Sequence, residues 1–129
     1  MRGQLFILVD LYILVYNLHM LEIQRTDEFA RWLKKLKDAN AKARINLRIR
    51  RISLTGNLGD FKPVGEGVFE LRIDYGPGYR VYFGRCGNEI ILLLIGGDKS
   101  TQQRDIVKAR QLNREYEQGK DPEGGNDGN

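Results

Sequence analysis

The chain has 129 residues, of which 41% are hydrophobic and 29% charged, and its formal net charge is +4 with a pI near 9.3. This length predicts one domain. A single cysteine and a single histidine exclude an internal disulfide, a cysteine-cluster zinc site and histidine-pair catalysis. The basic excess is concentrated between Ala39 and Gly59, where no acidic residue occurs. A basic surface of this kind attracts polyanions or an acidic protein partner.

Residues 1–19 contain a strongly apolar stretch, residues 5–18, which Asp10 interrupts. The stretch is shorter than the roughly 17–25 residues that span a bilayer, and no small-residue cleavage site follows it. We expect a start codon assigned too early, with translation from Met20. A membrane or export segment and an extra strand or interaction arm are the alternatives. The tail, residues 119–129, is polar and glycine-rich and is expected to be disordered, which leaves a domain over residues 20–118.

The domain is predicted to begin with a short strand at residues 21–26 and two helices. Thr26 or Asp27 is expected to cap the first helix, and its apolar residues at helical spacing are Phe29, Trp32, Leu33 and Leu36. The second helix is expected at about residues 41–53. It carries a basic stripe made of Arg44, Arg48 and Arg51. This stripe is either an RNA-binding surface or a solvated helix face. Residues 54–67 are expected to form a glycine-rich loop that brings Lys62 near the sheet.

Two alternating segments, residues 68–74 and 79–86, flank a turn with the sequence DYGPG, which indicates a hairpin. A second turn at Gly87-Asn88 and a continuous apolar strand at residues 89–95 follow, and a last helix is predicted from residue 100 to 118.

If the two segments pair, Arg72, Arg80 and Tyr82 lie on one face of the sheet, and Lys99 reaches the same rim. Such a group suits a phosphodiester that carries a stackable base. The alternative is a solvated face on which the arginines pair with Glu70 or Asp74. Gly96-Gly97 indicates either an anion site before the last helix or a tight strand-to-helix turn.

The predicted fold class is therefore α+β: a small antiparallel sheet of a short N-terminal strand and a three-stranded meander, with a helical hairpin and a C-terminal helix. Four stretches occur in this order: FARWLKKLKD, AKARINLRIRR, GDFKPVGEGVFELRIDYGPGYRVYF and IGGDKSTQQRDI. With these stretches, residues 21–117 resemble the RelE/ParE superfamily of toxins from type II toxin–antitoxin modules. The resemblance is closest to the phage-derived, HigB-like "addiction module killer protein" branch.

The resemblance implies a cytoplasmic toxin. Many members are endoribonucleases (mRNA interferases) that cut mRNA, often on the ribosome, and thereby inhibit translation. A cognate antitoxin, in this branch usually a small helix-turn-helix protein, neutralises them. ParE-type members inhibit DNA gyrase instead, and a ParE-like toxin is the alternative prediction. We expect no cofactor, no metal and no stable membrane association.

The resemblance also assigns site residues. By motif, the positions of the family's cleaving residues are Arg80, Arg72 and Lys99, to which the residue chemistry adds Tyr82 as a stacking platform or proton carrier. Glu70 is either a base or the partner of a structural salt bridge. The predicted RNA-binding residues are Lys62, Arg44, Arg48, Arg51 and Arg104. RelE has a tyrosine early in its last helix, where this chain has Gln103, Arg104 and Asp105.

Overall fold

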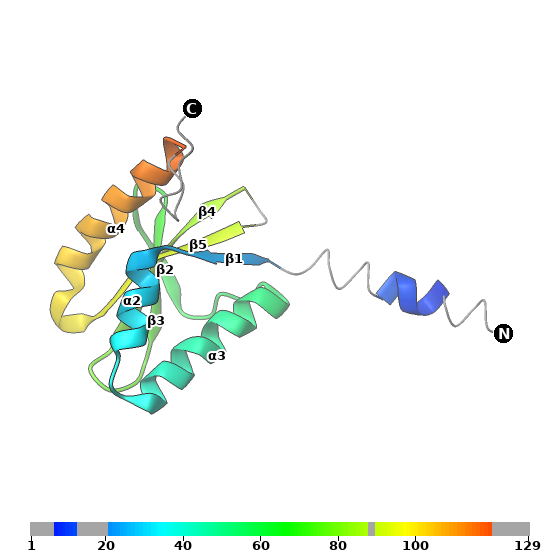
Figure 1. Cartoon of the computed structure of the whole chain (residues 1–129), viewed down its shortest axis with the longest axis horizontal. Helices are drawn as coiled ribbons and strands as arrows, with labels where there is room; N and C mark the ends of the chain where they lie inside the picture. Colours follow the sequence, from blue (N-terminus) through cyan, green and yellow to red (C-terminus); the bar gives the residue numbers. More distant parts are fainter. Residues whose placement is uncertain (1–6, 13–20, 88–89, 120–129) are drawn as a thin grey trace.

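The computed structural model describes residues 7–12, 21–87 and 90–119. Residues 7–12 are helical, with exposed apolar side chains, and no helix among the described residues is long and apolar enough to cross a membrane. Met20, Asn88 and residues 120–129, on which several predictions fall, lie outside the described ranges. The elements of the domain follow in chain order (Figure 1): β1 (Glu22–Arg25), α2 (Asp27–Lys35), α3 (Ala39–Thr55), β2 (Phe61–Gly65), β3 (Val68–Ile73), β4 (Tyr79–Cys86), β5 (Ile90–Asp98), the 3-10 turn η1 (Lys99–Thr101) and α4 (Gln102–Glu117).

The strands form one five-stranded sheet in the order β1-β5-β4-β3-β2, which confirms the α+β class. Two details differ from the sequence prediction. β1 lies parallel to β5, so the sheet is mixed rather than antiparallel. The predicted loop at residues 54–67 contains the edge strand β2, so the meander has four strands. β2 escaped prediction because it is mostly exposed and contains Pro63, which a strand tolerates at a sheet edge.

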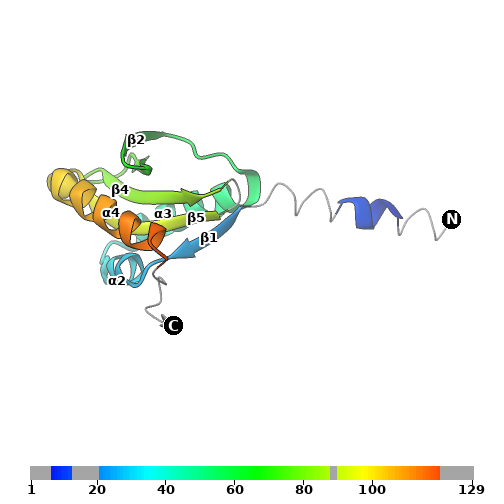
Figure 2. The same ribbon diagram turned by 90° about the horizontal axis from the view of Figure 1, so that it is seen from above.

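The two faces of the sheet carry separate apolar cores. On one face α2 and α3 pack through Phe29, Leu33, Ile45, Ile49 and Ile52 on Leu71, Val81, Phe83 and Leu93. On the other face α4, which runs beside β4 and β5 in Figure 2, packs through Ile106, Ala109 and Leu112 on Tyr82, Leu92 and Leu94. Alternate residues of each strand therefore contribute to different cores. The face under α4 is the one that carries the predicted site.

Side chains from outside the helices define where α2 and α3 begin. The buried Thr26 hydroxyl accepts a hydrogen bond from the Phe29 amide (2.9 Å) and donates one to the Leu94 carbonyl (2.7 Å), which joins the start of α2 to β5. Asp38 accepts from the amides of the first turn of α3. Asp38 is thus the N-cap of α3. α3 begins two residues earlier than predicted and ends at Gly56, which has a left-handed φ of 73°.

Gly96 and Gly97 belong to β5 itself, and they allow helices to approach both faces of the strand. A Cβ atom on Gly96 would collide with the Trp32 ring of α2, and one on Gly97 would collide with the Asp105 carboxylate of α4. Trp32 thus packs against the core, as predicted. Close packing on a strand, rather than a glycine turn before a helix, accounts for both glycines.

Gly96→Ala should destabilise the fold by about 1–3 kcal/mol, because the added methyl group overpacks the contact with Trp32. Urea denaturation followed by circular dichroism measures the loss. In a Trp32→Leu background the same substitution should cost less, since the ring that collides is gone. An equal cost in both backgrounds would show that the contact does not explain the glycine.

Candidate nucleic-acid site

A pocket of about 360 Å³ lies where the β3–β4 turn meets the end of β5. Arg72 from β3, Arg80 from β4 and Lys99 from η1 all line it. The remaining lining residues are Asp60, Asp74, Gly76, Pro77 and Gly78. The structure therefore brings together three cations from three different elements at one end of the sheet. Guanidinium and ammonium groups converging on one hollow suit a phosphate ligand.

The strand register places the two arginines directly opposite each other. Arg72 pairs with Arg80 and Glu70 pairs with Tyr82 between β3 and β4, so all four side chains share the face under α4. Like charges directly opposite on a sheet repel each other. An anion close to both guanidinium groups is therefore needed to hold them together.

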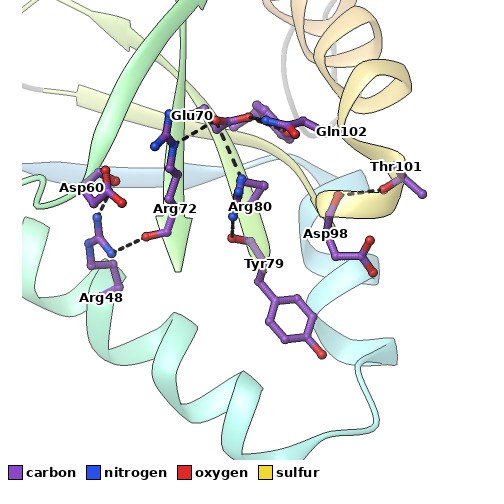
Figure 3. A network of polar contacts seen from close by, with 10 residues as sticks. Arg48, Asp60, Glu70, Arg72, Tyr79, Arg80, Asp98, Thr101 and Gln102 are labelled. Carbon is purple, nitrogen blue, oxygen red and sulfur yellow. Dashed lines mark hydrogen bonds and ion pairs between the residues drawn. The ribbon is translucent and has the colours of Figure 1, made fainter. Parts of the chain in front are cut away.

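Glu70 provides this anion from a fully buried position (0% exposed). Its Oε1 lies 3.5 Å from Arg72 Nε and 3.8 Å from Arg80 Nε. Its Oε2 accepts hydrogen bonds from the Tyr82 hydroxyl (3.0 Å) and from Gln102 Nε2 of α4 (2.8 Å), as Figure 3 shows in part. The salt bridge weighed in the sequence reading therefore exists and involves both arginines. We call Glu70, Arg72, Arg80, Tyr82 and Gln102 the Glu70 network.

Tyr82 occupies a different position from the one its predicted role requires. The side chain is fully buried under α4, so no ring face is open to a base, and the prediction of a stacking platform is wrong. Burial, reinforced by the neighbouring Glu70 carboxylate, raises the pKa of the Tyr82 phenol far above its usual range. The phenol therefore stays protonated and donates a hydrogen bond to Glu70. It fixes the position of that carboxylate and does not carry protons.

Gln102 was missed by the sequence reading. It is the first residue of α4, and it stands four positions before the buried Ile106. Residues four apart lie on the same side of a helix, so this spacing placed Gln102 on the sheet-facing side. No local pattern indicated that a buried carboxylate would meet it there.

Arg48 is used inside the protein rather than at the predicted basic surface. Its guanidinium donates to the carbonyl oxygens of Leu58 (2.8 and 3.0 Å), Asp60 (2.8 Å) and Arg72 (2.8 Å). Burial lowers the pKa of Arg48, although the nearby Asp60 opposes that shift. Figure 3 shows Arg48 of α3 reaching toward β3 beside the pocket. Arg48 thus ties α3 to two segments of the pocket wall and is not available as an RNA contact.

The other predicted RNA-binding residues lie around the pocket. Arg44 and Arg51 line a second cavity of about 300 Å³ on the α3 side, which we call the α3 cavity. Lys62 is exposed and pairs in register with Glu70, so it shares the sheet face of the two arginines. Arg104 is exposed and lines, together with Lys99, a further cavity at the start of α4. Among the described residues, no group of three or more His, Cys, Asp or Glu could hold a metal ion.

Asp105 is a second buried carboxyl beside this site. It is 5% exposed, lies against Gly97 of β5 and accepts a hydrogen bond from the Thr101 hydroxyl (2.5 Å). Burial raises the pKa of Asp105, and the Thr101 hydrogen bond and the exposed Arg104 partly oppose this. The buried carboxyl thus packs the start of α4 onto β5.

Comparison with known proteins identifies a close relative. No protein-family model matches the chain. An uncharacterized protein of Haemophilus influenzae is 52% identical over 95 residues, which cover 74% of this chain and 95% of that protein. The chain belongs to the family of that protein. Among solved structures, the RelBE2 toxin–antitoxin complex of Mycobacterium tuberculosis is similar with a TM-score of 0.48 and 18% identity, over 63% of this chain and 93% of that chain.

Glu70→Gln should destabilise the protein by about 1–3 kcal/mol, because it removes the buried charge that both guanidinium groups face. Glu66→Gln is the matched control, since the Glu66–Arg114 ion pair (2.6 Å) has both side chains 48% exposed and an exposed pair contributes at most about 1 kcal/mol. Urea denaturation of both variants at neutral pH makes the comparison. Equal losses would show that the Glu70 network adds no more than a surface pair.

Asp105→Asn should change how stability depends on pH. Because the folded protein holds the Asp105 proton more tightly than the unfolded chain does, this group's stabilising contribution is full below the unfolded pKa of about 3.9 and is lost as pH rises through the raised folded value. Asparagine keeps an acceptor for Thr101 but cannot titrate. The stability of the natural protein relative to the variant should therefore fall between pH 4 and pH 7 in urea denaturation. A relative stability that rises with pH would contradict the assignment.

Proposed function

We propose that this chain is the toxin of a type II toxin–antitoxin module of the HigB-like branch, and that it acts in the cytoplasm as a metal-independent endoribonuclease on mRNA. One observation carries the proposal: Arg72, Arg80 and Lys99, from three different elements, line a single pocket at the end of the sheet. The resemblance of residues 21–117 to the RelE/ParE superfamily implies cleaving residues at these same three positions. Inhibition of translation follows from loss of mRNA.

The pocket suits RNA because RNA carries its own nucleophile. In the proposed reaction the 2′-oxygen forms a bond to the adjacent phosphorus, the bond to the 5′-oxygen breaks, and the products end in a 2′,3′-cyclic phosphate and a 5′-hydroxyl. The protein has to hold the phosphate in line and stabilise the negative charge that builds on its oxygens. Arg80 is the principal phosphate clamp, and Arg72 and Lys99 are supporting cations.

The buried Glu70 network prepares this clamp. Arg80 is 13% exposed and Arg72 is 37% exposed, and each directs its Nε toward Glu70. Arg80 Nη1 also donates to the Tyr79 carbonyl (3.2 Å), which further fixes its guanidinium. A cation that is already oriented loses less conformational freedom when it meets the transition state. Glu70 and Tyr82 therefore act as positioning residues in the proposal, in place of the surface role first expected of Tyr82.

Side chains that line the pocket carry out proton transfer in the proposed reaction. Asp60 and Asp74 are the carboxylates that line it, and in the proposed reaction one of them accepts the proton of the 2′-hydroxyl. Lys99 is exposed at the pocket rim and supplies the proton that the departing 5′-oxygen needs. The step balances with one proton taken up and one released, and it uses side chains of this chain alone. Outside the cleavage cycle, we propose that a cognate antitoxin binds the protein and holds it inactive.

Arg80→Ala should remove mRNA cleavage, with a fall of about 10²-fold or more, because it deletes the main group that stabilises charge in the transition state. The full chain is induced briefly in cells without antitoxin, and new 5′ ends on mRNA are mapped. Arg85→Ala is the matched control, since Arg85 is an exposed arginine farther along the same strand.

Discrete new 5′ ends inside coding regions, present with the control and absent with Arg80→Ala, support the nuclease and the role of Arg80. Undiminished cleavage by Arg80→Ala would refute the site. Intact mRNA together with arrested growth would refute the nuclease, and DNA cleavage by gyrase would then be measured to test the ParE-like alternative.

A further inference from the structure

The α3 cavity adjoins the pocket that holds Arg72 and Arg80. Its lining consists of Arg44, Leu47, Arg48, Arg51, Ile73 and Asp74. Asp74 also lines the pocket, so the two hollows share this residue. We take this shared residue as the point at which an extended ligand would pass from the pocket to the α3 cavity.

A stacked pair stands at this junction. The guanidinium carbon of Arg44 lies 4.6 Å from the centroid of the Tyr75 ring, and Tyr75 is the turn residue that follows Asp74. The turn itself is held by hydrogen bonds from the Tyr75 amide to the Ile73 carbonyl (2.9 Å) and from the Gly78 amide to the Tyr75 carbonyl (3.1 Å). Tyr75 is half-buried and Arg44 is exposed, so the aromatic ring supports a guanidinium plane that borders the cavity.

The rest of the cavity suits the other parts of a nucleotide. Leu47 is 66% exposed and adds apolar surface beside the Arg44 plane. Arg51 adds a second exposed cation, whereas Arg48 is taken up by main-chain carbonyls. Unpaired bases stack on guanidinium planes and on aromatic rings, and phosphates pair with arginine. The carboxylates of an acidic peptide would use the charges of this cavity but not the flat face of Arg44.

We infer that the α3 cavity is a nucleotide subsite, which binds the nucleotide next to the phosphate in the pocket. The base stacks on Arg44 over Tyr75, and the phosphate of that nucleotide contacts Arg51. This inference rests on the proposed function and narrows its substrate to single-stranded RNA, because a base stacked on the protein is unpaired. The Arg44–Tyr75 pair thereby takes the stacking role that the sequence reading gave to Tyr82.

Arg44→Lys tests the subsite, since lysine keeps the charge and removes the plane. The matched control is Arg50→Lys, because Arg50 is an exposed arginine of the same helix that does not line the cavity. The probes are eight-nucleotide RNAs with 2′-O-methyl groups throughout, which cannot be cleaved, and with 2-aminopurine on the 5′ side or the 3′ side of the central phosphate. Fluorescence anisotropy measures affinity, and quenching of 2-aminopurine measures stacking. Circular dichroism and thermal melting confirm that each variant is folded.

The natural protein should quench one of the two probes, and Arg44→Lys should lose that quenching and bind about 10-fold more weakly, the size expected for one stacked base. Arg50→Lys should match the natural protein. Affinity for inorganic phosphate, which carries no base to stack on Arg44, should change less in Arg44→Lys. Tyr75→Leu should resemble Arg44→Lys, because the plane loses its support.

Equal binding and quenching by Arg44→Lys and Arg50→Lys would overturn the subsite. If cleavage in cells still depends on Arg80, that result leaves the proposed function standing. If Arg80→Ala also leaves cleavage and RNA binding unchanged, both proposals fail. A variant that binds RNA normally but loses affinity for the antitoxin would show a protein-docking cavity, which also overturns the inference.

Discussion

The buried carboxylate of Glu70 is the interaction on which the rest of the site depends. The register of β3 and β4 sets Arg72 opposite Arg80, and two like charges in that position would separate without an anion between them. A carboxylate that is 0% exposed is itself costly unless hydrogen bonds satisfy it. Tyr82 and Gln102 supply hydrogen bonds to its Oε2, and its Oε1 faces the two arginines at ion-pair distance without a hydrogen bond. Tyr82 of β4 and Gln102 of α4 thus stabilise the carboxylate, and the carboxylate in turn stabilises the pair of arginines.

The helices on the two faces contribute to the same pocket from opposite sides. On the α4 face, Gln102 completes the Glu70 network. From the other face, Arg48 of α3 reaches the carbonyls of Asp60 and Arg72 and fixes the main chain of the pocket wall. A polar group buried without such partners costs about 1–3 kcal/mol. A shift of either helix thus disturbs the pocket, although neither Gln102 nor Arg48 lines it.

Arginines of similar appearance in the sequence have three different tasks in the fold. Arg48 is structural, Arg80 faces both a buried anion and the pocket, and Arg44 lies on an aromatic ring at the boundary of the α3 cavity. The distinction matters for function because a free guanidinium can bind phosphate, whereas one whose donors are filled by carbonyls cannot. The proposed nuclease depends on Arg80 and its nucleotide subsite on Arg44, and the β3–β4 turn lies between these two arginines.

The sequence by itself determined the helices, the β3–β4 hairpin and its turn, and the sharing of one face by Arg72, Arg80 and Tyr82. These features follow from local periodicity, from Thr26 as a cap and from turn residues, all of which act over a few positions. It also placed Lys99 at the same rim, because a strand of given length ends at a given edge. The edge strand β2 was missed since exposed residues around Pro63 carry no apolar alternation.

Tertiary structure alone decided which of these side chains are accessible. Whether Tyr82 is a surface platform or a buried hydrogen-bond donor depends on where α4 lies, and the strand pattern is the same in both cases. Likewise, Arg48 is taken up by main-chain carbonyls because residues 58–60 pass beside α3. Gly96 and Gly97 have no room for a side chain because Trp32 and Asp105 from other elements pack against them. The burial of a side chain and its hydrogen-bond partners depend on residues far away in the sequence. A local pattern therefore predicts which side chains share a face of the sheet, but not which element covers that face.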